Sequence, residues 1–490
     1  MPYVKTWQLI AVSAVAGLAL SVAAVAAAGP WDSGQRKAER DRAASRGLAG
    51  GADHGGGRAG ALSRGHRPGD EPQAAPSAPG VLAGIGPGAP RTTGSGVAAA
   101  DSGQLAEVLR PLLADSALGT VRTASVIDTA TGRVLFESGA REAMTPASTT
   151  KIATAVAALS ALGPEHRIRT TVAPGAGPGE IVLVGGGDPS LTARKKSPAG
   201  SGGSLLALAA DTAQALKAVG TDSVRLGYDD TLFTGPARHP IGENPNIAPV
   251  TALAADEGRP DESTSGPVDR VEDPAKETAR SFAALLGERG IKVTAEPARA
   301  KAPAGAQPLA TTLSTPLAGL VERMLTNSDN DIAEVLARQT ALASGQPAGF
   351  EGAEKAVTAR LAALGVDTAG SRFADGSGLN RADKISTGLL AGLLAKAADP
   401  QRPELRPVLT GLPVAGFTGT LRGRNAGTSP AAGLVRAKTG TLTGVNSLAG
   451  TVVDSSGRLL AFAFLTANAP DPGAAEKGLD KLAAAVARAS

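Results

Sequence analysis

A long segment without core-forming residues sets the first limit on how this chain of 490 residues folds. Residues 29–100 contain 17 Gly and 7 Pro, but only six Ile, Leu, Val or Phe. Such a segment cannot bury enough apolar surface to offset the chain entropy that folding removes. We therefore expect residues 29–100 to form a disordered linker and the folded sequence to begin near Asp101.

An uncharged apolar stretch precedes this linker. Residues 8–28 follow Lys5 and end in a small-x-small pattern, which is typical of a secretory signal peptide and its cleavage site. Their length also suits an uncleaved membrane anchor. The basic cluster at residues 36–42 disfavours simple export, although such clusters are translocated in some proteins. We expect an exported protein of the cell envelope, secreted or anchored through residues 1–28, with no other membrane contact.

The net charge of +4 belongs to the N-terminal hundred residues. Residues 1–100 hold ten basic and six acidic side chains, and the remaining 390 residues hold 39 of each. Bulk charge therefore gives no reason to expect a nucleic-acid partner for the folded part. The chain has only 8 Phe, 2 Trp and 2 Tyr, which disfavours a surface that stacks on bases or sugars.

The scarcity of cysteine and histidine excludes several kinds of catalytic site. Cysteine is absent, so thiol nucleophiles, disulfides and thiolate metal sites are excluded. Two of the four histidines lie in the predicted linker, which leaves His166 and His239 for the folded part. Multi-histidine metal sites and most Ser-His-Asp schemes therefore lack their residues, and we expect no metal and no cofactor. We interpret His166 as a surface residue and His239 as a loop position, neither with a function.

Hydrophobic spacing predicts an α+β protein with an antiparallel sheet built from both ends of the folded sequence. The predicted helices cover residues 104–114, 147–162, 205–219, 317–325, 331–342, 352–364, 387–397 and 474–488. The predicted strands cover residues 122–128, 133–137, 181–184, 223–227, 434–442, 447–453 and 459–466. Turn-rich residues at 129–132 and 454–457 predict two hairpins.

A change in the pattern of predicted secondary structure marks an inserted region. From residue 168 to 310, short strands alternate with Pro/Gly-rich connections, whereas helical patterns dominate from about residue 317 onward. The size of this region is that of one small domain. We expect residues 101–167 and 311–490 to form the two parts of one domain, and residues 168–310 to be an inserted accessory domain.

Ser148 and Lys151 form the first candidate catalytic pair. They lie three residues apart at the start of a predicted helix, so the amine can reach the hydroxyl, and the helix dipole stabilises negative charge there. Lysine acts as a base only if its pKa falls toward neutrality. A fall of about three units corresponds to roughly 4 kcal/mol, which burial and a second cation can supply. Alone, the Ser-x-x-Lys pattern is common by chance and favours a helix N-cap with an exposed lysine.

Two further motifs favour an active site. Ser328, Asp329 and Asn330 lie between two predicted helices, where a hydroxyl and an amide can project together. Residues 438–441, Lys-Thr-Gly-Thr, lie on a predicted strand, where the glycine lets a ligand approach the backbone and Lys438 suits a carboxylate. Each motif alone fits a turn, a cap or a strand end. All three occur once, in this order, each on the element that its role requires.

With these motifs the sequence resembles the active-site serine penicillin-recognising superfamily, in particular the D-alanyl-D-alanine carboxypeptidase/endopeptidase branch of low-molecular-mass class C penicillin-binding proteins. Further stretches that resemble this branch are residues 185–191, 375–379, 413–416 and 419–421. The resemblance covers about residues 101–490. It implies a transpeptidase-like domain, an antiparallel sheet flanked by helices with a helical subdomain, that carries an inserted accessory domain. Residues 380–383 depart from the usual Ser-Arg-x-Asn, which leaves the loop contacts there open.

The resemblance implies a catalytic role for residues of all three motifs. Ser148 attacks the carbonyl carbon of the penultimate D-alanine, and Lys151 takes its proton. The backbone N–H groups of Ser148 and Thr441 hold the oxyanion. Ser328 relays a proton to the departing amine, and Asn330 holds the substrate amide.

The resemblance also implies the substrate and the inhibitors. Lys438, Thr439 and Thr441 bind the terminal carboxylate of a peptidoglycan stem peptide. Water hydrolyses the acyl-enzyme, which releases a shortened stem peptide or a cut cross-link. A β-lactam acylates Ser148 and leaves slowly, so penicillins are the expected inhibitors.

Two alternatives remain at this point. A serine β-lactamase uses the same motifs, but the long insert between Ser148 and Ser328 disfavours it. No Glu-x-x-Leu-Asn segment lies between Asn330 and Lys438 to supply a carboxylate for fast deacylation. A non-catalytic penicillin-sensing, wall-binding module is disfavoured because every catalytic side chain is present.

Overall fold

The computed structural model describes residues 102–196 and 201–488. The predicted signal peptide or anchor, residues 1–28, and the predicted linker, residues 29–100, lie outside the described residues. Among the helices of the described ranges, none combines the length and the apolar character that crossing a membrane requires.

The central sheet joins the two ends of the folded sequence, as predicted. Its strand order is β2-β1-β11-β10-β9, and every neighbouring pair is antiparallel. The strands are β1 (Val121–Asp128), β2 (Val134–Ser138), β9 (Val435–Leu442), β10 (Val445–Val453) and β11 (Leu459–Ala467). Both predicted hairpins are confirmed, because β1 pairs with β2 and β10 pairs with β11. Strand β9 lies at one edge of the sheet.

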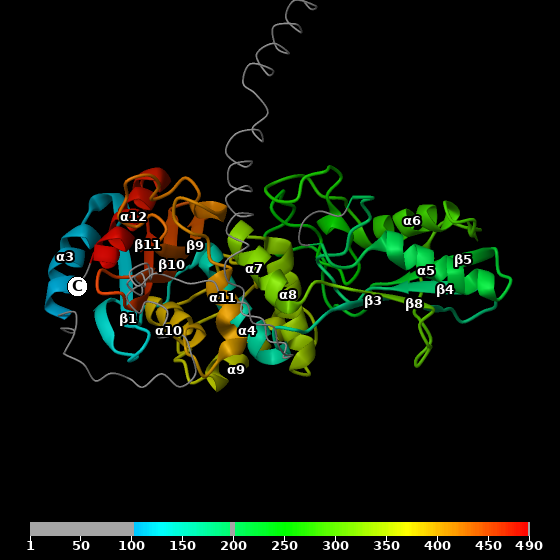
Figure 1. Ribbon diagram of the computed structural model, residues 1–490, viewed down its shortest axis with the longest axis horizontal. Coiled ribbons are helices and arrows are strands. Elements are labelled where there is room, and N and C mark those ends of the chain that lie inside the picture. Colours follow the sequence, from blue (N-terminus) through cyan, green and yellow to red (C-terminus); the bar gives the residue numbers. More distant parts are fainter. Residues whose placement is uncertain (1–101, 197–200, 489–490) are drawn as a thin grey trace, which may run out of the picture. The chain divides into compact units, whose positions relative to one another are not determined.

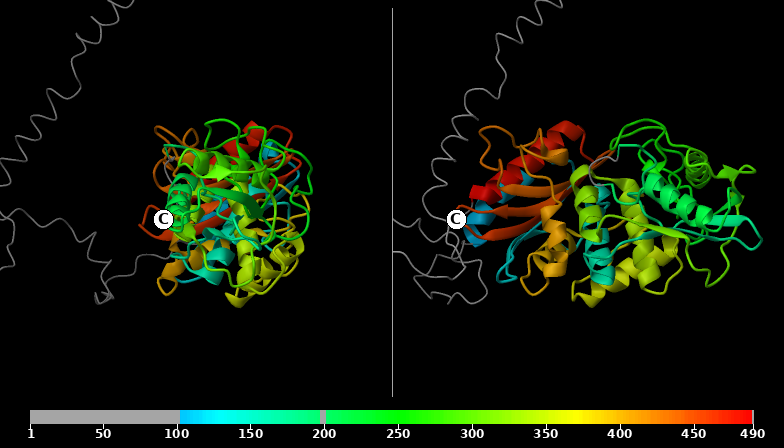
Figure 2. Two further views of the ribbon diagram at one scale, coloured as in Figure 1. Left: turned by 90° about the vertical axis from the view of Figure 1, so that its right-hand side faces the viewer. Right: turned by 45° about the vertical axis from the view of Figure 1, so that its right-hand side comes forward.

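Helices cover both faces of this sheet (Figures 1 and 2). Helices α3 (Ser102–Leu113) and α12 (Pro472–Arg488) pack on one face, where Phe462 and Phe464 of β11 point. Helices α4 (Thr150–Leu162) and α10 (Thr387–Ala397) lie against the other face. The alternation along β11 decides this division, since neighbouring side chains on a strand point to opposite faces.

Helix α4 is the centre of the helical subdomain. All of its residues from Thr150 to Leu159 are buried, so it is surrounded by protein rather than presenting one apolar stripe. The helices around it are α7 (Leu317–Asn327), α8 (Asn330–Ala343), α9 (Phe350–Ala363), α10 and the short α11 (Arg406–Thr410). Alanines at four of the ten buried positions of α4 allow these helices to approach closely.

The inserted region has a sheet and a core of its own (Figure 1). The strand order is β6-β5-β4-β3-β8, with β7 beside β5. Its elements are β3 (Arg169–Pro174), β4 (Glu180–Val184), α5 (Leu205–Ala218), β5 (Ser223–Asp229), α6 (Pro274–Gly287), β6 (Lys292–Val293), β7 (Ala298–Arg299) and β8 (Ala310–Leu313). Both helices contact this core, through Leu208 of α5 and Phe282 of α6.

Strands β3, β6, β7 and β8 of the insert were not predicted from the sequence, and two larger features were not predicted either. Helix α6 was missed although Asp273 caps its first turn and Pro274 occupies its first position, both ordinary start signals. The second feature is the segment between β5 and α6, residues 230–273, which we call the insert loop. Its only helix is the short 3-10 turn η3 (Asp256–Gly258), and it contains no strand of either sheet. This loop, rather than the insert's sheet, reaches the candidate active site.

Candidate active site

Ser148 lies on a tight turn immediately before the central helix. The sequence predicted one helix over residues 147–162, but residues Ala147–Thr149 form a 3-10 turn and α4 begins at Thr150. Ala147 has a φ of 51°, a left-handed conformation that is strained for a residue with a Cβ. The turn leaves Ser148 half-buried, while the residues on either side of it are buried.

Lys151 donates three hydrogen bonds from its buried amine. Its Nζ lies 3.2 Å from Ser148 Oγ, 2.6 Å from Asn330 Oδ1 and 2.6 Å from the carbonyl oxygen of Ser377. Asn330 and Ser377 offer only acceptors here, so they fix two N–H groups of the amine. When Lys151 is neutral, its lone pair is therefore left to face the Ser148 hydroxyl.

Burial lowers the pKa of Lys151 from its ordinary value to about 8. Nearby acidic side chains oppose this effect, Asp375 most strongly and then Asp329 and Glu334. The expected fall toward neutrality is therefore present, and burial is its cause. We expected a second cation to lower the pKa of Lys151 as well, but no cation is among the causes of its shift. Instead, the charge of Lys151 lowers the pKa of Lys438, the other buried lysine of the site.

Ser328 and Asn330 lie at the junction of two helices, as the sequence predicted. Ser328 ends α7 in the left-handed conformation, with a φ of 59°, and its side chain is half-buried. Asp329 caps α8, because its Oδ1 accepts a hydrogen bond from the N–H of Ile332 at 3.0 Å. Asn330 is the first residue of α8, and its amide oxygen bonds to Lys151.

Strand β9 runs against the turn that carries Ser148. A Cβ added to Gly440 would lie 2.8 Å from the carbonyl oxygen of Pro146 and 3.0 Å from the backbone nitrogen of Ser148. Only glycine therefore allows β9 to come this close to the turn. A glycine was expected here from the sequence so that a ligand could approach the strand, whereas in the structure the Ser148 turn approaches it. This contact brings the Lys-Thr-Gly-Thr motif beside the serine.

The outer edge of β9 is open where it passes Ser148. The N–H of Ala437 points away from β10, because it donates to the carbonyl oxygen of Pro413. Backbone groups on a strand alternate with a period of two residues, so the N–H groups of Thr439 and Thr441 point to the same outer edge. The hydroxyl of Thr439 donates to Thr420 Oγ1 at 2.9 Å.

Lys438 is the second buried lysine of the site. It is fully buried, and its Nζ donates to the carbonyl oxygen of Thr439 at 2.9 Å. Burial, and then the charge of Lys151, lower its pKa well below the ordinary value. The motif alone would also fit a lysine at a solvated strand end. The burial of Lys438 contradicts this alternative.

The carbonyl that holds Lys151 belongs to a tight loop over residues 375–380 that sequence reasoning did not assign a role. Oδ1 of Asp375 accepts hydrogen bonds from the N–H groups of Ser377 at 3.0 Å and Gly378 at 2.5 Å. Oε1 of Glu334, on α8, accepts from the N–H groups of Gly376 at 2.9 Å and Ser377 at 3.0 Å. Two buried carboxylates therefore shape this loop around the Ser377 carbonyl.

Asp383 fills the position where the sequence departs from its family. Its Oδ1 accepts from the N–H of Asp375 at 3.2 Å, and its Oδ2 accepts from the hydroxyl of Thr150 at 3.1 Å. Burial, and then the neighbouring Asp375 carboxylate, raise the pKa of Asp383 to about 10. Asp383 therefore keeps its proton at neutral pH, and the loop contact left open by the sequence is a neutral carboxyl group.

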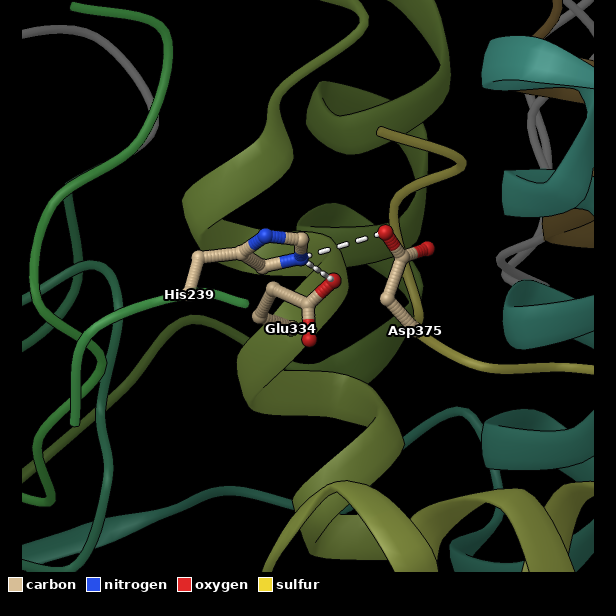
Figure 3. A group of neighbouring side chains, drawn as sticks. All are labelled: His239, Glu334 and Asp375. Carbon is tan, nitrogen blue, oxygen red and sulfur yellow. Dashed lines mark hydrogen bonds and ion pairs between the residues drawn. The ribbon is translucent and has the colours of Figure 1, made fainter. Parts of the chain in front are cut away.

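His239 is a correction to the sequence analysis. It lies in a loop, as interpreted, but its side chain is only 1% exposed and bonds to the catalytic part of the protein. Its Nε2 lies 3.1 Å from Asp375 Oδ2 and 3.8 Å from Glu334 Oε1 (Figure 3). A single histidine between an arginine and a proline carries no sequence signal for such a contact. His166, in contrast, is half-buried and close to the surface position interpreted for it.

The insert loop also contacts the start of α8. The amide nitrogen of Asn330 donates to the carbonyl oxygen of Asn246 at 2.9 Å. Asp331 Oδ1 accepts from the N–H of Ala248 at 2.8 Å, and its Oδ2 pairs with Arg270 at 3.0 Å. These contacts fix the Asn330 amide, so that its oxygen faces Lys151.

Two groups of side chains in the described residues bring potential metal ligands within 4.8 Å of one another. They are His239 with Glu334 and Asp375, and Glu257 with Asp329 and Asp331. In the first group the carboxylates already accept hydrogen bonds from backbone N–H groups of the 375–380 loop. In the second group they face Arg323 and Arg270. Both groups are therefore accounted for by internal hydrogen bonds and ion pairs.

The fold and the site together define a class of protein. An antiparallel sheet packs on a buried helix, and a serine and a buried lysine lie at the start of that helix. A lysine-bearing edge strand lies beside them. This is the arrangement of the penicillin-recognising serine enzymes.

Comparisons with known proteins identify the family within that class. The chain matches the family described as D-Ala-D-Ala carboxypeptidase 3 (S13) over residues 105–265 and 260–486. Carboxypeptidase DacB of Mycolicibacterium smegmatis is 38% identical over 78% of this chain and 83% of its own length. D-alanyl-D-alanine carboxypeptidase of an Actinomadura species is 31% identical over 73% of this chain and 80% of its own length.

A solved structure shares the fold. Penicillin binding protein 4 (dacB) from Haemophilus influenzae has a TM-score of 0.63 and 23% identity, and the match covers 77% of this chain and 98% of that chain. A second structure of that protein, complexed with a β-lactam, has a TM-score of 0.59.

The chain belongs to the D-Ala-D-Ala carboxypeptidase 3 (S13) family, and it is a serine-type D-Ala-D-Ala carboxypeptidase. The predicted membership of the penicillin-binding proteins is thereby confirmed, as is the predicted α+β transpeptidase-like fold with an additional domain. Of the three hypotheses drawn from the sequence, the family supports the carboxypeptidase.

Proposed function

We propose that the enzyme cleaves the terminal D-Ala-D-Ala bond of peptidoglycan stem peptides, and the corresponding bond in cross-links, through an acyl-enzyme on Ser148. The observation that carries this proposal is the buried amine of Lys151, 3.2 Å from Ser148 Oγ and bonded to two fixed acceptors. A lysine with a pKa near 8 holds a useful fraction of neutral amine at neutral pH, which suits a general base.

In the acylation step, Lys151 takes the proton of Ser148 as Oγ attacks the carbonyl carbon of the penultimate D-alanine. A tetrahedral oxyanion forms between the N–H groups of Ser148 and Thr441. The outward direction of the Thr441 N–H, and the approach of Gly440 to the Ser148 nitrogen, support this assignment.

The carboxylate of the terminal D-alanine binds at β9, to Lys438, Thr439 and Thr441. Without substrate the Thr439 hydroxyl donates to Thr420 Oγ1 at 2.9 Å and the Thr441 hydroxyl to Glu476 Oε1 at 3.1 Å, so both hydroxyls exchange these partners for the carboxylate. Lys438 has its pKa held down by burial and by Lys151. An arriving carboxylate supplies a counter-charge and works to raise the pKa of the amine again. Recognition of the C-terminus thus depends on a buried lysine whose charged form the ligand stabilises.

Breakdown of the tetrahedral intermediate releases the terminal D-alanine as an amine. Ser328 passes a proton to this leaving group, and Asn330 holds the substrate amide. Water then attacks the acyl carbon, Ser148 recovers its proton, and the shortened peptide leaves. A β-lactam acylates Ser148 in the same way, but its ring-opened leaving group stays attached, so the adduct persists.

The reaction takes place outside the cytoplasmic membrane, where peptidoglycan is found. The apolar stretch at residues 8–28 supports export, as a signal peptide or as an anchor. Fractionation of cells that express the full chain tests this part of the proposal. Activity retained in the cytoplasm would contradict it.

Intact-mass analysis after exposure to benzylpenicillin is the decisive experiment for the active site. We expect the wild-type enzyme to gain one penicilloyl mass and the Ser148→Ala variant to gain none. D-alanine release from a D-Ala-D-Ala peptide should be lost in the same variant. Rapid penicillin turnover without D-alanine release would instead identify a β-lactamase, and an identical adduct on the alanine variant would refute the assignment of Ser148.

A further inference from the structure

One side chain of the insert loop is buried inside the catalytic part of the protein. His239 reaches between α8 and the 375–380 loop (Figure 3). Its ring is held edge-on to Phe350, with the ring centres 5.3 Å apart. The insert loop has an ion pair at the neighbouring residue Arg238, but that pair is with the exposed Glu243 and stays within the loop. His239 therefore contacts the catalytic part of the protein, whereas the side chain of its neighbour Arg238 does not leave the loop.

The hydrogen bonds of His239 define its tautomer. Its Nδ1 accepts a hydrogen bond from the N–H of Ile241 at 3.3 Å, so this nitrogen carries no proton. The neutral ring then carries its proton on Nε2, which donates to Asp375 Oδ2 at 3.1 Å. His239 therefore holds Asp375 through the hydrogen bond that Nε2 donates.

Asp375 is the link from His239 to the catalytic lysine. Its other oxygen accepts the N–H groups of Ser377 and Gly378, and Oδ2 also accepts the N–H of Asn380 at 2.6 Å. The carbonyl of Ser377, in the middle of this loop, accepts the 2.6 Å hydrogen bond from Lys151. A fixed Asp375 therefore means a fixed acceptor for the amine.

The balance of charge on Asp375 also depends on His239. Burial works to raise the pKa of Asp375, but the hydrogen bond from His239, with those from the loop, outweighs it, and the pKa lies below its ordinary value. Asp375 is in turn the acidic side chain that most strongly raises the pKa of Lys151. A substitution of His239 should therefore change the pKa of Lys151 through one intervening carboxylate, that of Asp375.

We propose that His239 is a positioning residue for Lys151: its Nε2–H holds Asp375, and Asp375 holds the loop whose Ser377 carbonyl orients the amine toward Ser148. The inserted domain thereby supplies a side chain on which the chemistry of the other domain depends. This inference rests on the proposed role of Lys151 as the base for Ser148.

Three substitutions of His239 in the full-length enzyme separate positioning from packing. In His239→Gln, the side-chain nitrogen occupies the place of Nε2 and keeps the donor. In His239→Asn the shorter amide cannot reach Asp375, and in His239→Leu the donor is lost but the volume is kept. Arg238→Gln, next in sequence and exposed, is the matched control.

The readout is the second-order rate of acylation by benzylpenicillin, measured against pH. We expect Leu and Asn at position 239 to lower the rate by about ten- to a hundredfold, because a small displacement of a catalytic group has effects of that size. The Gln variant and the control should stay within about threefold of wild type. With a D-Ala-D-Ala peptide the loss should fall on kcat, with KM little changed.

The pH profile gives a signature that loss of packing does not. The ionisable groups that face Lys151 are Asp375, Asp329, Glu334, Asp383 and Lys438, and those that face His239 are Asp375 and Glu334. Without the His239 donor, burial raises the pKa of Asp375 with less opposition, so the Asp375 charge raises the pKa of Lys151 less strongly. The acidic limb of the profile should therefore move to lower pH in the Leu and Asn variants and stay in place in Gln.

The outcomes distinguish this proposal from the proposed function. If wild type is not acylated at Ser148, the proposed function fails. If wild type is acylated and the Leu and Asn variants match it in rate and pH profile, only the role of His239 fails. If all three variants lose the same activity with an unmoved limb and a lowered melting temperature, His239 acts in packing alone and the proposal is wrong.

Discussion

Helix α4 and strand β9, which we call the α4 wall and the β9 wall of the active site, each carry a buried lysine. The two lysines differ in the charges around them, and this difference bears on what each can do. On the α4 wall, Lys151 is surrounded by acidic side chains that oppose the effect of burial, and its pKa is about 8. On the β9 wall, burial and the charge of Lys151 act together on Lys438, and its pKa falls well below the ordinary value. Burial alone thus does not define a function for a lysine; the neighbouring charges do.

The same difference supports the two different tasks proposed for the lysines. An amine with a pKa near 8 exchanges a proton readily at neutral pH, as a general base must. An amine that lacks a counter-charge is stabilised in its charged form only when an anion binds beside it. The α4 wall is therefore suited to proton transfer and the β9 wall to carboxylate recognition.

Removal of Lys151 should have the largest effect. Lys151→Met keeps an unbranched side chain but abolishes the base, so acylation by benzylpenicillin should fall by about a thousandfold or more. The rate of adduct formation by mass spectrometry measures it. A loss of less than tenfold would mean that another group takes the serine proton.

Removal of Lys438 should have a smaller and more selective effect. Lys438→Met should lower kcat/KM for a D-Ala-D-Ala peptide by about a hundredfold, since charge-assisted hydrogen bonds contribute about 1.5–3 kcal/mol. The same peptide with a C-terminal amide should be a poor substrate of wild type and lose little further activity in the variant. An equal loss for both peptides would contradict carboxylate recognition by the β9 wall.

The pH dependence of acylation should follow Lys151. Because the neutral amine is the active form, the rate should rise with pH up to a limb near pH 8, and fall by about tenfold per pH unit below it. Rates measured with benzylpenicillin between pH 5 and 9 provide the test. A flat profile from pH 6 to 9 would show that Lys151 is not the titrating base.

The neutral carboxyl of Asp383, behind the α4 wall, should affect stability rather than chemistry. Native Asp383 keeps its proton up to about pH 10, whereas the unfolded chain loses it near pH 4, so its contribution to stability falls as pH rises between these values. The free energy of unfolding of wild type relative to Asp383→Asn should therefore decrease from pH 5 to pH 8, by up to about 1.4 kcal/mol per pH unit.

Urea unfolding at several pH values measures this change. Asp211→Asn, the same substitution at an exposed position, serves as the control. A difference between wild type and Asp383→Asn that stays constant with pH would mean that Asp383 is ionised in the native state.

Much of the fold followed from local patterns. The strands of the central sheet were found because they are runs of Val, Leu, Ala and Phe joined by turn residues, and both hairpins lie between neighbours in sequence. Strands β3, β6, β7 and β8 and helix α6 were not predicted. The strands β6 and β7 have only two residues each, which is too short for a period to be detected, and α6 is rich in alanine and charge. Local sequence signals fail where an element is stabilised mainly by its contacts with neighbouring elements.

The candidate site divides in the same way. Ser148, Lys151 and Asn330 were found from spacing and motif order, and the structure brings all three together. Glu334, Asp375 and His239 were missed, since a buried carboxylate or imidazole is recognised only by its partners, which lie far away in sequence. No spacing rule connects His239 with a residue 136 positions later.

By itself the sequence determined which reactive groups the protein has: a serine, two lysines and an amide, with no cysteine and too few histidines for other schemes. Residue type and spacing suffice for this, because they limit the chemistry that a chain can perform. Only the tertiary structure decided the state of those groups, the pKa of each lysine and the tautomer of His239. Those properties depend on burial and on charges brought from distant segments, and neither exists before the chain folds.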